Sequence, residues 1–137
     1  MHLPHQPARR GAAVVELALL LPFLAFIFII AVDWARIFYY SQTVTNCARN
    51  GAIYSSDPFS MATSPYTNVT AASLADASDL TPAPTVTSTS GTDASGFSYV
   101  DVTVSFDFQT VTNFPGVPGT MTIARTVRVY LAPRLPN

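Results

Sequence analysis

The segment that decides the fold reads RRGAAVVE at residues 9–16 and continues as the apolar run LALLLPFLAFIFIIAV at residues 17–32. Glu16 is the only charged side chain between Ala12 and Val32, a stretch of 21 residues. A helix of that length rises about 32 Å, which matches a hydrocarbon core of about 30 Å. The sequence therefore predicts one transmembrane helix over residues 12–32, with Pro22 producing a kink near residues 18–22.

Glu16 is the residue of this segment that needs an explanation. A carboxylate inside hydrocarbon costs roughly 2.5 to 3.5 kcal/mol on insertion scales. In the plainer interpretation, Glu16 belongs to an ordinary anchor and extends toward the lipid headgroups. In the other, a cut after Gly11 makes Ala12 a new N-terminus, whose positive amine in one subunit pairs with Glu16 of a neighbour. The arrangement favours the second interpretation, because the cut creates the partner that the carboxylate lacks.

Charges at the two ends of the apolar run predict its orientation. Arg9 and Arg10 precede the run, whereas Asp33 and Arg36 follow it and cancel each other. The positive-inside rule therefore places residues 1–11 in the cytoplasm and everything after Asp33 on the outer face of the membrane.

The helical pattern continues beyond the membrane. Apolar or small residues recur at spacings of three and four along one stripe, namely Ile37, Tyr40, Val44, Cys47, Gly51 and Tyr54, with Arg36, Thr43, Asn46 and Asn50 opposite. This period predicts an amphipathic continuation over residues 33–56, ended by Asp57-Pro58. Cys47, the single cysteine, lies on the apolar stripe and is expected to be a buried thiol; an intermolecular disulfide is the alternative.

The sequence pattern of residues 57–137 predicts a connector, a short helix and a sheet. Asn68 is a candidate N-cap for a helix over residues 69–80, after a connector at residues 57–67. Alternating or β-rich segments follow at residues 85–90, 98–109 and 120–131, with Arg125 interrupting the apolar face of the last. The links between them are too short for a crossover helix, so the three strands should be antiparallel. Their apolar face needs a cover, and residues 33–54 form the only long amphipathic helix available.

Composition argues against several classes of function. The chain has seven arginines, no lysine and a net charge of −1, which offers no basic surface for nucleic acid. Both histidines, His2 and His5, precede Gly11, so a chain cut there has no histidine for a catalytic triad or a His-containing metal site. The carboxylates beyond residue 56 are dispersed and without the spacing of a calcium loop. We therefore expect no catalytic residues, no metal, no cofactor and no enzymatic activity.

The N-terminal third resembles a known family. Gly11 followed by Glu16 at the fifth position of the cut chain is similar to the prepilin and pseudopilin pattern read by type IV prepilin peptidases. More specifically, RGAAVVELALLLP at residues 10–22, DWARIFY at residues 33–39 and TNCARNGA at residues 45–52 resemble TadE-like proteins of the tight adherence (Tad, Flp) pilus system. The Leu-Pro pair and the Asn-x-Ala-Arg-x-Gly-Ala segment occur together and in order, although Cys47 stands where Ala is commoner and Asp33 where Glu often occurs.

The resemblance implies a minor pilin or pseudopilin with an α+β, type IV pilin-like fold: a long N-terminal transmembrane-plus-amphipathic helix packed on a small antiparallel three-stranded sheet. Residues 1–11 would be a leader, Gly11 and Ala12 would flank the bond cut by a prepilin peptidase, and Glu16 would act in assembly. The implied partners are that peptidase, other pilins or pseudopilins, an inner-membrane assembly platform and membrane lipid. The implied location is the bacterial inner membrane, with the C-terminal domain in the periplasm or, within a pilus, outside the cell.

Two alternatives stay open. In the first alternative, the chain is a single-span, membrane-anchored extracytoplasmic binding protein that enters no pilus. In the second, it is closer in role to the related TadF-like proteins. TadG-like relatives carry a much larger outer domain than 137 residues can provide.

Overall fold

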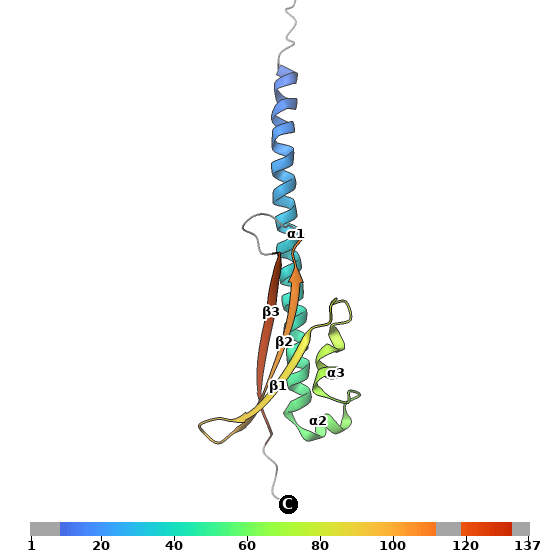
Figure 1. The fold of residues 1–137 in the computed structure, drawn as a ribbon, viewed down its shortest axis with the longest axis vertical. Helices are drawn as coiled ribbons and strands as arrows, with labels where there is room; N and C mark the ends of the chain where they lie inside the picture. Colours follow the sequence, from blue (N-terminus) through green and yellow to red (C-terminus); the bar gives the residue numbers. More distant parts are fainter. Residues whose placement is uncertain (1–8, 112–118, 133–137) are drawn as a thin grey trace, which may run out of the picture.

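The computed structural model describes residues 9–111 and 119–132 as one long helix set against a three-stranded antiparallel sheet (Figure 1). The elements in chain order are α1 (Arg9–Ser56), α2 (Pro58–Thr63), α3 (Val69–Ser73), the 3-10 turn η1 (Leu74–Asp76), β1 (Thr85–Thr92), β2 (Ser98–Gln109) and β3 (Thr120–Tyr130). The predicted α+β fold with a long N-terminal helix packed on the sheet is confirmed.

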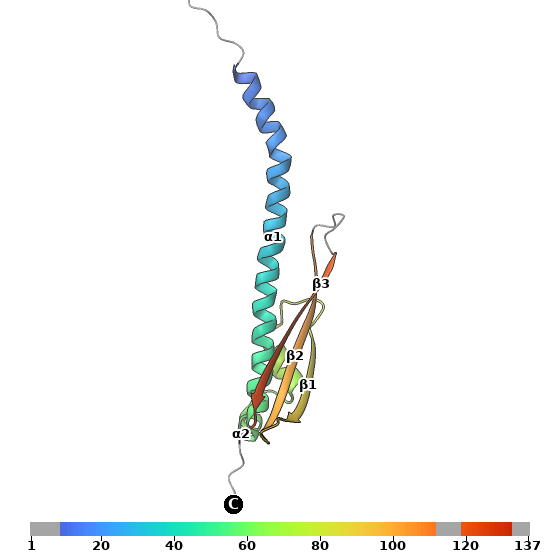
Figure 2. The same ribbon diagram turned by 90° about the vertical axis from the view of Figure 1, so that its left-hand side faces the viewer.

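Helix α1 runs without interruption through the apolar segment and the amphipathic segment. It begins at Arg9 and ends at Ser56, where Asp57-Pro58 stops it as the sequence predicts. Pro22 lies inside the helix. Figure 2 shows α1 bent in its N-terminal part, the part that contains Pro22, because proline cannot donate its helical hydrogen bond and crowds the preceding turn.

The sheet has the order β1-β2-β3, with both pairs antiparallel. Val86 stands opposite Val104 in the first pair, and Phe106 stands opposite Ile123 in the second. The three predicted strands are confirmed to within two residues at each end. Their alternation places the even-numbered residues of β2 on the face toward α1 and the odd-numbered ones on the solvent face.

One apolar core joins the C-terminal half of α1 to the sheet. Its buried members are Val44, Cys47, Ala48 and Ala52 from α1, Val102, Val104, Phe106 and Phe108 from β2, Ile123 from β3, and Ala77 and Leu80 from the segment after α3. Figure 2 shows α1 along one face of the sheet. Burying a side chain such as Phe108 stabilises the fold by roughly 1.5–3 kcal/mol, so β2 contributes the largest share of the sheet's side of the core.

Cys47 is fully buried within this core. Burial raises the pKa of its thiol, because the charged thiolate loses solvation, and the nearby Asp76 and Asp79 carboxylates raise it further. The predicted buried thiol is confirmed, and the alternative of an exposed cysteine available for an intermolecular disulfide is not supported.

Two side chains of α1 face the domain although the sequence places them on the solvated side. Arg36 is half-buried against the ring of Phe108, and Asn50 donates to Asp76 of η1 at 2.8 Å. The prediction was wrong for both because it assumed one covered face. The sheet covers one side of α1 and the α3–η1 segment covers another, so polar residues at the edges of the stripe also find partners.

The segment between α1 and the sheet differs in detail from its prediction. The expected connector contains α2, for which Asp57 Oδ1 accepts from the Phe59 amide at 3.2 Å. Asn68 caps α3 as predicted, with Oδ1 accepting from the Ala71 amide at 2.8 Å. The helix does not reach residue 80: it ends at Ser73 and tightens into η1, and the turns that follow bring Ala77 and Leu80 into the core.

Gly51 allows the close approach of α1 to α3 and β2. A Cβ atom at this position would lie 2.1 Å from Ser73 Oγ and 2.9 Å from Val102 Cγ1, closer than real Cβ contacts allow. Ser73 is itself fully buried, and within the described residues its hydroxyl makes no hydrogen bond. The glycine of the Asn-x-Ala-Arg-x-Gly-Ala segment is therefore a packing requirement.

We expect Gly51→Ala to destabilise the domain formed by residues 33–111 and 119–132, called the outer domain below, by about 1–3 kcal/mol, because overpacking pushes α3 and β2 away from α1. Thermal unfolding of the full chain in detergent, followed by near-UV circular dichroism, measures the change. The matched control is Gly11→Ala, since a Cβ there meets nothing within 4 Å. Adding Ser73→Ala should recover part of the loss, and a Gly51→Ala variant as stable as the parent would contradict the packing argument.

Candidate functional site

The residues predicted to act in processing and assembly lie at the free end of α1. Gly11, Ala12 and Glu16 occupy the first turns of the helix and are exposed. Nothing outside the helix lies within 4 Å of the Gly11 Cβ position. Glu16 makes no hydrogen bond or ion pair with any other residue in the described part of the chain. The carboxylate is therefore available to a group outside the described residues.

Helical geometry places Ala12 and Glu16 on the same face, one turn apart. Residues at this spacing have Cβ atoms about 5–6 Å apart, and the side chain at the later position leans back toward the N-terminus. An amine created at Ala12 would thus lie on the face that carries the Glu16 carboxylate. The geometry allows pairing with the amine of a neighbouring subunit and also within one chain.

The surroundings of this site are apolar. All residues from 11 to 32 are exposed, including Val14 at 67% and Phe28 at 68%. Figure 1 shows this half of α1 extending well beyond the sheet. Among the described residues, α1 is the one helix that is long and apolar enough to cross a membrane, which fits a single-pass anchor. Continuous apolar surface of this extent is covered by lipid or by other chains.

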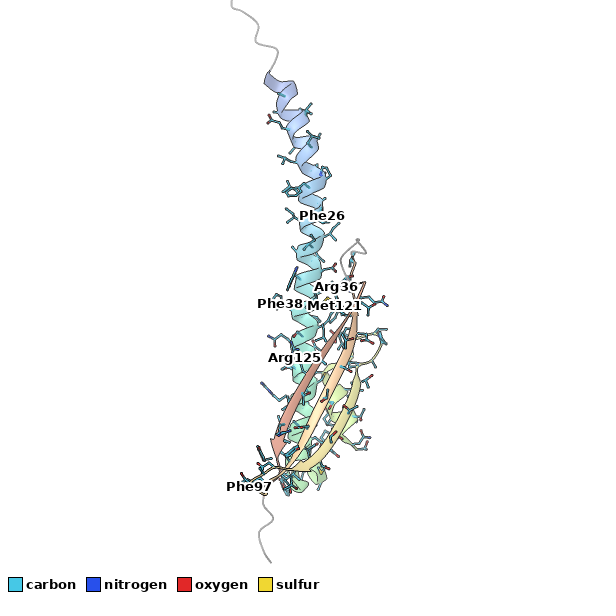
Figure 3. The ribbon with its side chains drawn as sticks, turned by 60° about the vertical axis from the view of Figure 1, so that its left-hand side comes forward. Phe26, Arg36, Phe38, Phe97, Met121 and Arg125 are labelled. Carbon is cyan, nitrogen blue, oxygen red and sulfur yellow. The ribbon has the colours of Figure 1, made fainter. Side chains whose placement is uncertain are left out.

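A second charged site lies where α1 meets the sheet. Asp33 is only 5% exposed, and its Oδ1 accepts from the Val111 amide at 3.0 Å. Arg36 Nη1 approaches the same oxygen at 3.5 Å, and the Arg36 guanidinium lies 4.8 Å from the centroid of the Phe108 ring. Figure 3 shows Arg36 on the sheet side of α1. The carboxylate thus fastens the segment after β2 to the first turn beyond the apolar run.

The sequence predicts Asp33 and Arg36 as charges that cancel at a membrane boundary, with Arg36 opposite the apolar stripe. In the structure Asp33 is buried, Arg36 is half-buried, and both contact the end of β2 or the residues after it. The available signal was the spacing of three residues, which places the two side chains on one face of the helix directly after the apolar segment. Their long-range partners, 78 residues further along the chain for Val111, carry no local signal.

Further polar contacts fix the edges of α1 to the outer domain. The Tyr39 hydroxyl donates to Asp79, and this hydrogen bond raises the pKa of Tyr39 because it places a negative charge beside the phenol. On another side of the helix, Arg125 Nη2 donates to Ser41 Oγ at 2.7 Å. The arginine that interrupts the apolar face of β3 therefore reaches back to α1. Apolar contacts in the middle and polar contacts at the edges hold residues 33–55 against the domain.

The solvent face of the sheet carries one well-formed ion pair. Arg128 Nε and Nη2 donate to the two Asp101 carboxylate oxygens at 2.7 Å each, and the guanidinium lies 3.8 Å from the centroid of the Tyr99 ring. These hydrogen bonds hold the pKa of Asp101 below its usual range. Within residues 9–111 and 119–132, no three histidine, cysteine, aspartate or glutamate side chains are grouped as a metal site requires.

Comparison with known families identifies the N-terminal segment. Residues 11–52 match the family model described as TadE-like protein. The matched segment begins at the predicted cut site and includes Glu16, the Asp33 junction and Gly51. No curated protein and no solved structure matches the chain.

We expect Asp33→Ala to lower the stability of the outer domain by about 1–3 kcal/mol, because it leaves the Val111 amide and the Arg36 guanidinium without their acceptor. The readouts are the thermal unfolding temperature and hydrogen exchange at the Val111 amide, which should become faster. Asp107→Ala is the matched control: Asp107 is exposed and accepts from the Thr122 hydroxyl, so its loss should change stability by no more than about 0.5 kcal/mol. Equal effects of the two variants would contradict the role given to Asp33.

Proposed function

We propose that this chain, with its TadE-like segment at residues 11–52, acts in a Tad pilus system as a minor pilin or pseudopilin. In this proposal a prepilin peptidase cuts between Gly11 and Ala12, and the mature subunit then takes part in assembling Tad/Flp pili for adhesion or secretion. The observation that carries the proposal is the family match, which begins at Gly11 and covers a helix whose apolar half has no cover within the described part of the chain.

Accessibility of the cut site supports the processing step. Gly11 and Ala12 are exposed in the first turn of α1, and Figure 1 shows that end of the helix far from the sheet, so the sheet does not obstruct a membrane peptidase. In this proposal the chain is the substrate of that peptidase and not itself an enzyme. The leader with Arg9 and Arg10 remains on the cytoplasmic side, as the positive-inside rule favours.

The proposed assembly role of Glu16 follows from the free-energy cost of placing its carboxylate in lipid. A carboxylate on an exposed apolar helix is costly in lipid, and so is a free amine at Ala12. Pairing the Glu16 carboxylate of one subunit with the Ala12 amine of the next relieves both costs at once and sets the axial register between helices. The partners are other pilins or pseudopilins gathered at an inner-membrane assembly platform, with lipid covering the rest of the helix.

We expect Gly11→Val to block processing without disturbing the fold, because the position is open. When the chain is co-expressed with the prepilin peptidase of a Tad system, the variant should keep its leader of 11 residues and migrate more slowly on a gel than the processed parent. Leu20→Val, further along the same helix, is the control and should be processed normally. A Gly11→Val protein of the same size as the processed parent would contradict the cut site.

Glu16→Gln tests assembly separately from processing. We expect this variant to be cut normally but to be recovered with the other pilins about tenfold less than the parent, since a tenfold loss corresponds to about 1.4 kcal/mol of pairing energy. Quantitative immunoblotting of co-purified subunits measures the loss, and Glu16→Asp, which keeps the charge, should retain part of the recovery. Parental recovery of Glu16→Gln would instead support the plain membrane-anchored binding protein.

A further inference from the structure

Strand β1 is an open edge of the sheet. It pairs with β2 along its whole length, from Thr85 opposite Ser105 to Thr92 opposite Ser98. Within the described residues, no strand pairs with its other side. Figure 1 shows β1 at the border of the sheet nearest α3 and far from the apolar half of α1. Along the outer side of β1, the main-chain groups that β2 does not use are left for water or for another chain.

The edge lacks the features that normally prevent strand addition. Proteins protect edge strands with charged residues, prolines, bulges or very short strands, or cover them with a helix or loop. Helix α3 contacts β1, but among the described residues no strand pairs with its outer side. The sequence of β1, TVTSTSGT, has no charge and no proline, and its register with β2 is continuous over eight residues. The opposite edge strand, β3, carries Arg125 and Arg128. The asymmetry leaves β1 as the edge suited to pairing.

A hollow lies beside the inner face of the same strand. It has a volume of about 320 Å³ and extends from β1 beneath the sheet to the end of α1 and the residues after β3, being lined by Ser55, Met61, Val69, Ser88, Ser90, Val100, Leu131 and Ala132. Ser88 and Ser90 stand opposite Val102 and Val100 and face the same way. Because these two serines are small where β2 has valines, β1 does not fill the space between the sheet and the short helices α2 and α3. The two small serines of the edge strand therefore leave the β1 side of this hollow unfilled.

We propose that β1 is a docking site for an extended segment of a partner protein, which adds a strand to the sheet and places an apolar side chain in the hollow. An added strand would lie about 4.8 Å beyond β1, and alternate side chains would fall on the face of Ser88 and Ser90. Main-chain hydrogen bonds supply affinity in this mode of recognition, and a pocket for alternate side chains supplies specificity. The partner segment is thus extended, uncharged on its inner face and apolar at every second residue.

A different protein suits the site better than a second copy of this chain. If β1 paired with β1 of another copy, the inner-face residues brought to the hollow would be those of β1 itself, which are mainly small and polar. Pairing with β3 of a second copy would bring Arg125 beside an apolar lining. The strand that already pairs with β1 shows the required pattern, since β2 presents Val100, Val102, Val104 and Phe106 on one face. The proposal does not depend on processing at Gly11.

The test uses a peptide with the sequence of residues 100–107, VDVTVSFD, labelled with fluorescein, and the full chain in detergent micelles. Fluorescence anisotropy measures binding, and hydrogen exchange reports which amides become protected. We expect saturable binding and new protection at alternate amides of β1. A peptide N-methylated at alternate residues, which cannot form the main-chain ladder, should bind at least about tenfold more weakly.

Two variants of β1 distinguish peptide binding at this edge and its hollow from non-specific binding. Ser88→Lys places a charge at the hollow and should weaken binding at least about tenfold, whereas Thr87→Lys on the outer face of the same strand should change it by less than about threefold. Both positions are exposed, so both variants should fold, as thermal unfolding will check. The proposal is overturned by absent binding, by equal effects of the two variants, or by protection that appears outside β1. A dimer of the unliganded chain that Ser88→Lys dissociates would assign the edge to a second copy and also contradict it.

Discussion

The backbone hydrogen-bond ladder of α1 continues from Arg9 to Ser56, with Pro22 the one interior residue that has no amide to donate, so a single helix joins the exposed apolar segment to the segment packed on the sheet. Its surface changes accordingly. From residue 11 to residue 32 every side chain is exposed, whereas from residue 33 onward one side is buried by the sheet and another by α3 and η1. Because the helix is continuous, the orientation of its apolar half determines the orientation of the domain packed on its other half.

The two carboxylates at the ends of the apolar run have opposite surroundings: Asp33 is buried and Glu16 is exposed. Asp33 is buried and accepts hydrogen bonds from the protein itself, so its charge is satisfied within the chain. Glu16 has no ion-pair or hydrogen-bond partner among the described residues and lies on the exposed half of the helix. Among the described residues, contacts within the chain satisfy Asp33 but not Glu16. This contrast assigns Asp33 to the fold, and it is the physical reason for which we propose an assembly role for Glu16.

Much of the architecture could be predicted from local patterns. The alternation in β2, the apolar period of α1 and the Asp57-Pro58 stop each depend on neighbouring residues, and the structure agrees with all three. Gly51, Arg36 and the hollow could not be predicted in the same way. Gly51 matters because Ser73 and Val102 approach it, Arg36 because the Phe108 ring lies beside it, and the hollow because Ser88 and Ser90 face α2 and α3. Each depends on contacts between residues far apart in the sequence.

Electron spin resonance on the full chain in lipid tests the continuous helix most directly. Spin labels at Phe23 and Asn46, both exposed, in a Cys47→Ala background span 23 residues on the outer-domain side of Pro22. An unbroken helix predicts a single narrow distance distribution centred near about 35 Å, from a rise of 1.5 Å per residue. A broad distribution, or a second maximum at shorter distance, would show a hinge between anchor and domain and contradict the account.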